Sequence, residues 1–511
     1  MEKNLPIKIC IIGCGTYGSY LIRSLTEKYG NDIQITAIEI GDEKTKDESE
    51  IGLAAESGSA RAAAQGRYFG LGGTSARWGG QVLFFDERDN PLQQRDWDTI
   101  VDINNQYRRT VLQKVLGNVP MIDTLMNDKG NEKTGIWLKY AKRNMFKALN
   151  KSHLSAVNIL KNQRVIDFVF ENRMIKSVLC QNSVTPKRDE AKGIMEERNP
   201  DSEWKGGIST FEADVFYLTA GAIESCRLLL DMNEKHKIIT STDLGKHYGD
   251  HLSVDLFRIE HRPFIDNTDF LPRFVKGSMV TKRWVVKDKT GRVGFAHPVL
   301  NKEVKVFTSI KRMLFGKQKI DFSIKDVFEG LEFLIRFAFN VLILKKMYAH
   351  RNIWSLQLEM EQAFPNDNSI SLAEQKDKFG QRVARLNWRV SESDRQAIDD
   401  VKTYLQQKLD AEKIKYTLVY DPNIEGAKIE DVYHPSGFIR LGHDDNAVLD
   451  TNCRVKGIDN LYHFSTAMFP SVKSASPTAA GFCFIEHHLE TVFPNLISKQ
   501  IQSDNLTASV F

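Results

Sequence analysis

The 511-residue sequence lacks a strong excess of charge of either sign. It has 70 Lys and Arg residues against 66 Asp and Glu residues, a formal net charge of +4, and the charges form no long runs. Nucleic-acid-binding proteins concentrate basic residues on one surface, so the composition does not support a nucleic-acid partner. With 41% hydrophobic and 27% charged residues, we expect a water-soluble protein with two or more cores and a small-molecule partner.

Cysteine pairs with metal-site spacing are also missing. The six cysteines form no CxxC pair, and several lie in apolar runs, where a thiol behaves as a small hydrophobe. We therefore expect a reducing compartment and no metal cofactor. The N-terminal residues MEKNLPIK lead into an apolar strand without a secretory signal region, which predicts a cytoplasmic protein.

A run of about 20 apolar residues, the length that spans a bilayer, is absent, so no transmembrane segment is predicted. The most apolar later segment, FLIRFAFNVLILKKMY from Phe333, is shorter and contains Arg336 and Asn340. We interpret it as a helix of the protein core. A helix that lies on a membrane surface or covers a substrate is the alternative.

Residues 7–18, IKICIIGCGTYG, contain the most informative motif, because an apolar strand enters a GxGxxG turn and then a helix. The three glycines permit the tight turn, let backbone amides approach a phosphate, and let the helix pack closely on the strand. The helix would direct its positive N-terminal end at a pyrophosphate. The motif therefore predicts a dinucleotide site, and its candidate residues are Gly13, Gly15, Thr16, Tyr17 and Gly18.

A second predicted strand, IQITAIEI, carries Glu39 near its end, 21 residues after Gly18. A carboxylate at this place can accept hydrogen bonds from both hydroxyls of an adenosine ribose, and it disfavours a 2′-phosphate. The sequence has no second GxGxxG motif, so a separate nicotinamide-binding domain is not predicted.

Two further segments with glycine have the character of cofactor contacts. GLGGTSARWGGQ begins at Gly70, and its missing side chains would let the backbone approach a flat or anionic group. A flexible loop is the alternative, although flexible linkers rarely contain a tryptophan. VFYLTAGAIESCRLLL repeats the order of strand, glycine turn and helix. The candidate residues are Gly72, Gly73, Thr74, Ser75, Trp78, Gly79, Gly80, Gln81, Ala220 and Gly221.

The middle of the chain alternates apolar and polar residues. The segments VNILKN, RVIDFVF, MIKSVLCQ and FEADVFYLTAG predict a small antiparallel meander that returns to the main sheet. A polar excursion at residues 183–204 is expected to be an exposed loop. From about residue 255 to 420, strands mix with helices such as SESDRQAIDDVKTYLQQKL. We expect this part to form a second domain that covers the substrate.

Taken together, the motifs resemble those of the glucose-methanol-choline (GMC) flavoprotein oxidoreductases over nearly the whole chain. The matching blocks, in order, are GCGTYG with Glu39, GLGGTSARWGG, YLTAGAIESCRLLL, and the C-terminal HPSGFIRLG with NLYHFSTAMFP and SPT. The resemblance implies an α/β fold, with a Rossmann-like FAD-binding domain of the GMC and glutathione-reductase type and a second α+β substrate domain. The expected FAD-binding domain is discontinuous, residues 1–100, 155–254 and 430–511, and the substrate-binding domain with its helical cover is residues 101–154 and 255–429.

The same resemblance implies how FAD lies. Its ADP half would lie on the first glycine motif and Glu39, its adenine near Val165, and its isoalloxazine at residues 78–81. In some sugar oxidases of the family, a His directly before the Trp of this loop binds FAD covalently. Arg77 stands there in this chain, so we expect non-covalent FAD. Further cofactor contacts implied by the C-terminal blocks are Ser465, Thr466, Pro477 and Thr478.

The family's catalytic histidine corresponds to His434 of YHPSG. Alcohol oxidation requires the hydroxyl proton to leave as hydride moves to flavin N5, and a neutral imidazole, with a pKa near ~6.5, can accept that proton. Relatives place His or Asn at the partner position, where this chain has Ser476, which can donate a hydrogen bond to the substrate oxygen. Ser465 stands where many relatives have Asp, and we expect Asp250 and His251 to lie behind the catalytic residues.

The GGTSARW form is most similar to that of the sugar-oxidising members and the polysaccharide-cluster members. We therefore expect an FAD-dependent dehydrogenase or oxidase that acts on an alcohol, in particular on a secondary hydroxyl of a sugar or glycoside. Oxygen, a quinone and a redox protein all stay open as the electron acceptor. A lyase that keeps FAD as a structural element and a non-catalytic flavin-binding scaffold are the alternatives.

Overall fold

The computed structural model describes residues 6–53, 55–58, 66–117, 122, 128, 130–183, 207–259, 272–275, 277–300, 324–345, 354–377, 379–421 and 428–497. The predicted polar loop at residues 183–204 lies, apart from residue 183, outside the described residues.

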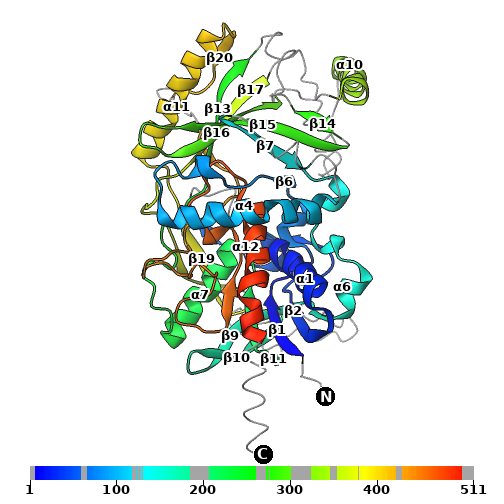
Figure 1. Ribbon diagram of the computed structural model, residues 1–511, viewed down its shortest axis with the longest axis vertical. Helices are drawn as coiled ribbons and strands as arrows, with labels where there is room; N and C mark the ends of the chain where they lie inside the picture. The colour runs from blue at the N-terminus through cyan, green and yellow to red at the C-terminus, as the bar shows by residue number, and fades with distance from the viewer. Residues whose placement is uncertain are drawn as a thin grey trace, which may run out of the picture.

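A five-stranded parallel sheet forms one end of the elongated molecule (Figure 1). Its order is β22 (Leu461–His463), β12 (Val215–Leu218), β1 (Ile7–Ile12), β2 (Ile33–Ile38) and β8 (Val157–Leu160). The apolar run of β1 is explained by this position, because a central parallel strand is buried on both faces. The helices that follow β1, β12 and β22 in the chain are α1 (Thr16–Tyr29), α7 (Ala222–His236) and α12 (Pro477–Thr491).

The predicted antiparallel meander is smaller than the sequence pattern indicated. It consists of β9 (Gln163–Glu171), β10 (Met174–Asn182) and β11 (Ile208–Glu212). The assignment of VNILKN to this meander is wrong, because β8 pairs in parallel with β2 instead. A short apolar strand has the same local pattern in either sheet, and only its pairing partner distinguishes the two.

A second, antiparallel sheet lies at the opposite end, with α4 (Arg95–Leu116) crossing the middle of the molecule and α12 running from α4 alongside the parallel sheet (Figure 1). Its strand order is β20 (Tyr416–Leu418), β13 (His251–Ile259), β17 (Trp354–Glu361), β16 (Val293–Leu300), β15 (Ser278–Lys287), β7 (Glu132–Trp137) and β6 (Gln81–Val82), with β14 (Arg273–Val275) beside β15 and β21 (Glu430–Asp431) beside β13. The predicted helix of SESDRQ is α11 (Glu392–Ala411), which begins at an N-cap formed by Ser391. Chain segments far apart in sequence thus build one sheet, and the predicted domain boundaries stay a prediction.

Short elements complete the described structure. They are β3 (Lys46–Asp47), β4 (Glu56–Ser57), β5 (Tyr68–Phe69), β18 (Ser369–Lys376), β19 (Arg382–Asn387), α2 (Glu48–Ile51), α6 (Lys151–Ser155), η1 (Gly30–Asp32), η2 (Gly73–Ala76), η3 (Glu87–Asp89), η4 (Tyr140–Lys142), η5 (Phe146–Ala148) and η8 (Thr466–Met468).

The prediction of a core helix at FLIRFAFNVLILKK is wrong. The segment forms α10 (Ile324–Phe339) and a following π-helical turn, η6 (Asn340–Leu344), at the edge of the molecule (Figure 1). Leu331, Ile335 and Leu342 are 54, 62 and 64% exposed. An apolar helical pattern predicts an apolar face, but it does not specify which surface covers that face. Within the described ranges, every helix is too short or too polar to cross a bilayer.

The turn between β1 and α1 depends on glycine at two positions. A Cβ on Gly18 would lie 1.9 Å from the carbonyl oxygen of Gly13, and a Cβ on Gly13 would lie 2.7 Å from Cα of Ala220. Gly13 also has φ +101°, which L residues with side chains rarely adopt. The close approach of helix and strand predicted from the motif is therefore present.

We expect Gly18→Ala to destabilise the protein by ~1–3 kcal/mol, because α1 must move off the Gly13 carbonyl. Thermal unfolding should show a Tm lower by at least ~2 °C. Gly58→Ala is the matched control, since nothing lies within 4 Å of a Cβ at that position. Equal Tm values for the two variants would contradict the close packing.

Candidate active site

The carboxylate of Glu39 connects three segments around the glycine turn. Its Oε2 accepts from the N–H of Cys14 at 2.9 Å, and its Oε1 accepts from the N–H groups of Gly41 at 3.0 Å and Gly70 at 2.9 Å. Burial raises the pKa of Glu39, while the backbone N–H donors oppose that shift. A carboxylate has about four acceptor sites, and these three N–H groups leave one of them open. Contact of Glu39 with ribose hydroxyls therefore stays a prediction.

The two glycine-containing loops lie against each other. The N–H of Gly72 donates to the carbonyl of Cys14 at 2.8 Å, and a Cβ on Gly73 would lie 2.8 Å from Cα of Gly15. Gly72 and Gly73 have φ values of +92° and +50°. Tyr17, the second residue of α1, is buried, and its hydroxyl donates to the carbonyl of Pro477 at 3.5 Å. The structure therefore brings the first motif, the second loop and the start of α12 together.

Three helices begin beside these loops without a side-chain cap. Their N-cap residues are Gly15 for α1, Gly221 for α7 and Ser476 for α12. The first turns of α1, which starts at Thr16, and of α12 contain no acidic residue. A Cβ on Gly221 would meet nothing within 4 Å. Uncapped N–H groups and positive helix ends suit an anionic ligand, so the residues present fit a dinucleotide such as FAD.

The loop from Thr74 to Gly80 uses several of its predicted contact groups within the protein. The Ser75 hydroxyl donates to the Gly72 carbonyl and accepts from the N–H of Met145. The Trp78 indole N–H donates to the Arg143 carbonyl at 2.8 Å. Thr74 is exposed, Gly79 packs against the ring of Trp137, and Gly80 has φ +75°. Contact of this loop with a cofactor stays a prediction. Such contact would use the backbone of the loop and the indole ring of Trp78.

The remaining predicted cofactor contacts lie on β9, beside the glycine turn, and between the end of β22 and the first turn of α12. Val165 is buried on β9, and Ala220 packs beside Gly13. Ser465 is buried, with its hydroxyl 2.7 Å from Nε2 of His463 and accepting from the N–H of Ala467. The Thr466 hydroxyl donates to the Pro435 carbonyl at 2.7 Å, next to His434. Pro477 and the half-buried Thr478 form the first turn of α12.

His434 is half-buried and forms a direct contact with His251, with their Nδ1 atoms 2.9 Å apart. Nε2 of His251 lies 2.8 Å from the carbonyl oxygen of Lys473. A carbonyl only accepts, so Nε2 of His251 must carry a proton. Burial lowers the pKa of His251, and a neutral His251 then accepts at Nδ1. His434 therefore donates from Nδ1, and its Nε2 keeps a free lone pair.

Asp250 holds the backbone of this histidine pair. Its carboxylate accepts from the N–H groups of His251 at 2.7 Å and of His434 at 3.0 Å. Burial raises the pKa of Asp250 well above its usual value, and nearby Asp431 acts in the same direction. Burial likewise lowers the pKa of His434 to about 3, with His251 acting in the same direction. The expectation that Asp250 and His251 lie behind His434 agrees with these contacts, and His434 is neutral at ordinary pH.

One face of the antiparallel sheet adds polar side chains that the sequence did not single out. Glu359 on β17 lies 3.4 Å from Nε2 of His297 on β16 and 3.7 Å from Nδ1 of His251 on β13. Arg283 on β15 lies with its guanidinium carbon 3.7 Å from the ring centre of Phe295. The available signal was the presence of charged residues among the apolar residues of predicted strands, as in LQLEME and TKRWVV. No local motif indicates that these strands are neighbours.

Gln81 joins Ser476 to this face. Its side-chain oxygen accepts from Arg283 and lies 3.4 Å from the Ser476 hydroxyl, and its amide nitrogen donates to Thr281 at 3.0 Å. Among the described hydrogen bonds, none joins Ser476 directly to His434. The two predicted catalytic residues are linked instead through the segment of residues 473–476, since Lys473 contacts His251.

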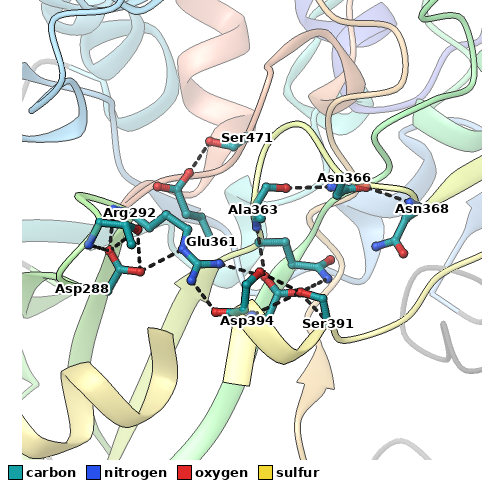
Figure 2. A network of polar contacts seen from close by, with 12 residues as sticks. Asp288, Arg292, Glu361, Ala363, Asn366, Asn368, Ser391, Asp394 and Ser471 are labelled. Carbon is teal, nitrogen blue, oxygen red and sulfur yellow. Dashed lines mark hydrogen bonds and ion pairs between the residues drawn. The ribbon is translucent and has the colours of Figure 1, made fainter. Parts of the chain in front are cut away.

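Buried ion pairs fix that segment to the sheet. Lys133 on β7 contacts both Asp89 and the hydroxyl of Ser474. Glu361 on β17 contacts Lys473 Nζ at 3.0 Å and the hydroxyl of Ser471. Figure 2 shows Glu361 directed at Ser471, beside the network in which Arg292 links Asp288 to Asp394 at the start of α11. The sheet therefore determines where the start of α12 lies.

His251, Glu359 and His434 offer ligand atoms that all lie within 4.8 Å of one another. Such a set could also hold a metal ion. The direct hydrogen bond between the histidines accounts for their approach without an ion. The expectation of no metal cofactor stays a prediction.

Comparison with known proteins agrees with the sequence blocks. Residues 365–483 match the family described as GMC oxidoreductase. An oxygen-dependent choline dehydrogenase of Vibrio vulnificus (strain YJ016) is 42% identical over 66 residues, and a pyridoxine 4-oxidase of Microbacterium luteolum is 38% identical over 61 residues. Each alignment covers only 12% of this chain and 12% of the relative.

The fold of the whole chain is similar to a solved structure. The crystal structure of pyridoxine 4-oxidase from Mesorbium loti matches with a TM-score of 0.54 and 14% identity, over 95% of this chain and 99% of that chain. At this identity the match concerns the fold alone, which is an α/β fold of the kind found in that enzyme.

We expect His434 to remain neutral and protonated at Nδ1 between pH 8 and pH 5, because its lowered pKa lies below this range and the neutral form exists above the pKa. Nitrogen-proton correlation spectra of histidine-labelled protein can test this, with the His434 signal identified by its absence in His434→Ala. Free histidine, which titrates near ~6.5, is the reference. Protonation of His434 between pH 6 and 7 would contradict the lowered pKa.

Proposed function

We propose that this chain is a member of the GMC oxidoreductase family, whose family model matches residues 365–483, and that it oxidises an alcohol with non-covalently bound FAD. The observation that carries the proposal is the free Nε2 of a neutral His434. A base with its lone pair available, held by a second histidine and by backbone contacts to Asp250, is what proton removal from an alcohol needs.

In this mechanism the substrate hydroxyl donates to Nε2 of His434. The proton moves to Nε2 as a hydride leaves the carbinol carbon, and the product is an aldehyde or ketone. The Nδ1–H of His434 keeps its hydrogen bond to His251, so the ring does not need to rotate. Glu359 favours the protonated form of both histidines and thus stabilises the imidazolium that the step creates.

The proposed FAD site uses the uncapped starts of α1, α7 and α12 together with the loop of residues 72–81. When bound, FAD supplies the acceptor for the hydride. Glu39 positions the loop amides through Cys14 and Gly70 and keeps an acceptor site for the ribose. Arg77 faces the ring of Tyr68, with 5.5 Å between its guanidinium carbon and the ring centre, and arginine cannot form the histidyl link to a flavin.

Ser476 is proposed to donate to the substrate oxygen. Its hydroxyl lies beside Gln81 at the start of α12, a helix end without a side-chain cap. For the substrate itself, we propose a secondary hydroxyl of a sugar or glycoside, on the basis of the GGTSARW form of the loop. The named activities of the relatives, on choline and pyridoxine, support alcohol oxidation as the reaction class.

We expect the purified protein to be yellow and to release intact FAD into the supernatant on acid or heat precipitation. The reason is that Arg77 stands where a covalent link would need histidine. Absorbance of the supernatant and of the pellet measures the partition. Flavin that remains in the pellet would contradict non-covalent binding.

We expect His434→Ala to slow anaerobic flavin reduction by at least ~10²-fold with FAD still bound, because the variant loses the proton acceptor. Ser476→Ala is the comparison, and loss of one hydrogen bond between neutral groups, ~0.5–1.5 kcal/mol, should slow reduction about 2- to 13-fold. Stopped-flow mixing with a panel of alcohols and sugars, at matched FAD content, measures both.

The same panel separates the alternatives. A redox enzyme bleaches its flavin, a lyase forms product while the flavin stays yellow, and a scaffold does neither. Reduction of His434→Ala at the wild-type rate would remove His434 from the mechanism.

A further inference from the structure

Arg283 is a buried cation at the centre of the polar sheet face. It is 3% exposed. Its strand, β15, pairs with β16 in a register that places Trp284 opposite Ala296, and extension by one pair places Arg283 opposite His297. The charge of Arg283 influences the pKa of His434 and of His251, both of which it helps to lower. The guanidinium therefore lies within electrostatic range of the proposed catalytic base.

The other cations that join this face to the segment of residues 471–476 have acidic partners. Lys133 is paired with Asp89, and Lys473 is paired with Glu361. Arg283 takes part in none of the ion pairs of the described residues. Its only described hydrogen bond is donated to the Gln81 side chain, and its Nε and Nη1 have no acceptor. Buried N–H groups without an acceptor are costly and rare in folded proteins.

Glu359 does not remove this deficit. The ion pairs of Glu359 are with His297 and His251. Its negative charge acts to hold Arg283 protonated, so that burial lowers the pKa of Arg283 only to about 10. Arg283 thus remains charged near pH 7. The Nε and Nη1 groups of Arg283 therefore need an acceptor that the described chain does not supply.

We propose that Arg283 binds an anionic group of the substrate, in the first instance a carboxylate, so that the substrate is a hydroxy acid such as a sugar acid. This inference rests on the alcohol oxidation proposed above and specifies its substrate class. The planar fork of guanidinium matches a carboxylate, and such charge-assisted hydrogen bonds are about twice as strong as neutral ones. Arg283 would hold the anionic end while another part of the substrate presents its hydroxyl to His434.

The test measures binding rather than turnover. Calorimetric titration of the FAD-loaded protein would compare gluconate with glucitol, its neutral counterpart, and 3-hydroxypropionate with 1,3-propanediol. We expect each acid to bind the wild type at least about tenfold more tightly than its neutral partner. In Arg283→Gln this preference should fall to less than about twofold, and Arg283→Lys should retain part of it. Far-UV circular dichroism and FAD content check that the variants fold.

Two results would overturn the inference: equal affinity of the wild type for acids and their neutral partners, or a preference for acids that survives in Arg283→Gln. If, in the second case, the FAD affinity and flavin spectrum of Arg283→Gln also change, Arg283 is assigned to the flavin. If Arg283→Gln does not fold, the wild type and Arg283→Lys decide. If acids bind as expected but no alcohol bleaches the flavin, the oxidation fails while the anion site stands.

Discussion

A single buried carboxylate organises the half of the protein that contains the parallel sheet and the two glycine loops. Glu39 accepts hydrogen bonds from the glycine turn at Cys14, from the chain after β2 at Gly41, and from the second loop at Gly70. Without it, three buried N–H groups would lose their acceptor, at a cost of roughly 1–3 kcal/mol each. By holding Cys14 and Gly70, the carboxylate also supports the close approach of Gly15 and Gly73 at the proposed dinucleotide site.

The second constraint is the polar face of the antiparallel sheet. An ordinary sheet of this size buries an apolar face, but here charged residues from β7 and β17 contact the segment before α12. Arg283 on β15 is linked to the start of α12 through Gln81. Most of these charges form ion pairs, and the attraction within each pair offsets much of the free-energy cost of removing the charges from water. The arrangement holds the start of α12 and the His434 loop against one another, although they come from different parts of the chain.

The histidine pair derives its chemistry from burial. A half-buried His434 beside a fully buried His251 stays neutral, and the Lys473 carbonyl determines which nitrogen of the pair carries each proton. The His434 ring is therefore oriented by a hydrogen-bond chain that ends on the backbone carbonyl of Lys473. Its neutral state does not require a nearby cation, although the charge of Arg283 acts in the same direction.

The sequence by itself determined the β1 turn and the glycine loops, because these depend on local geometry, whereas His434 was singled out by the family resemblance of its YHPSG block. A glycine with a positive φ, or with a carbonyl 1.9 Å from its missing Cβ, is visible in a short motif. Only the tertiary structure decided that β8 joins the parallel sheet, that α10 is exposed, and that Arg283 lies near His434. Those facts depend on which strands and surfaces meet, and the meeting of segments far apart in the chain leaves no periodic signal in either segment.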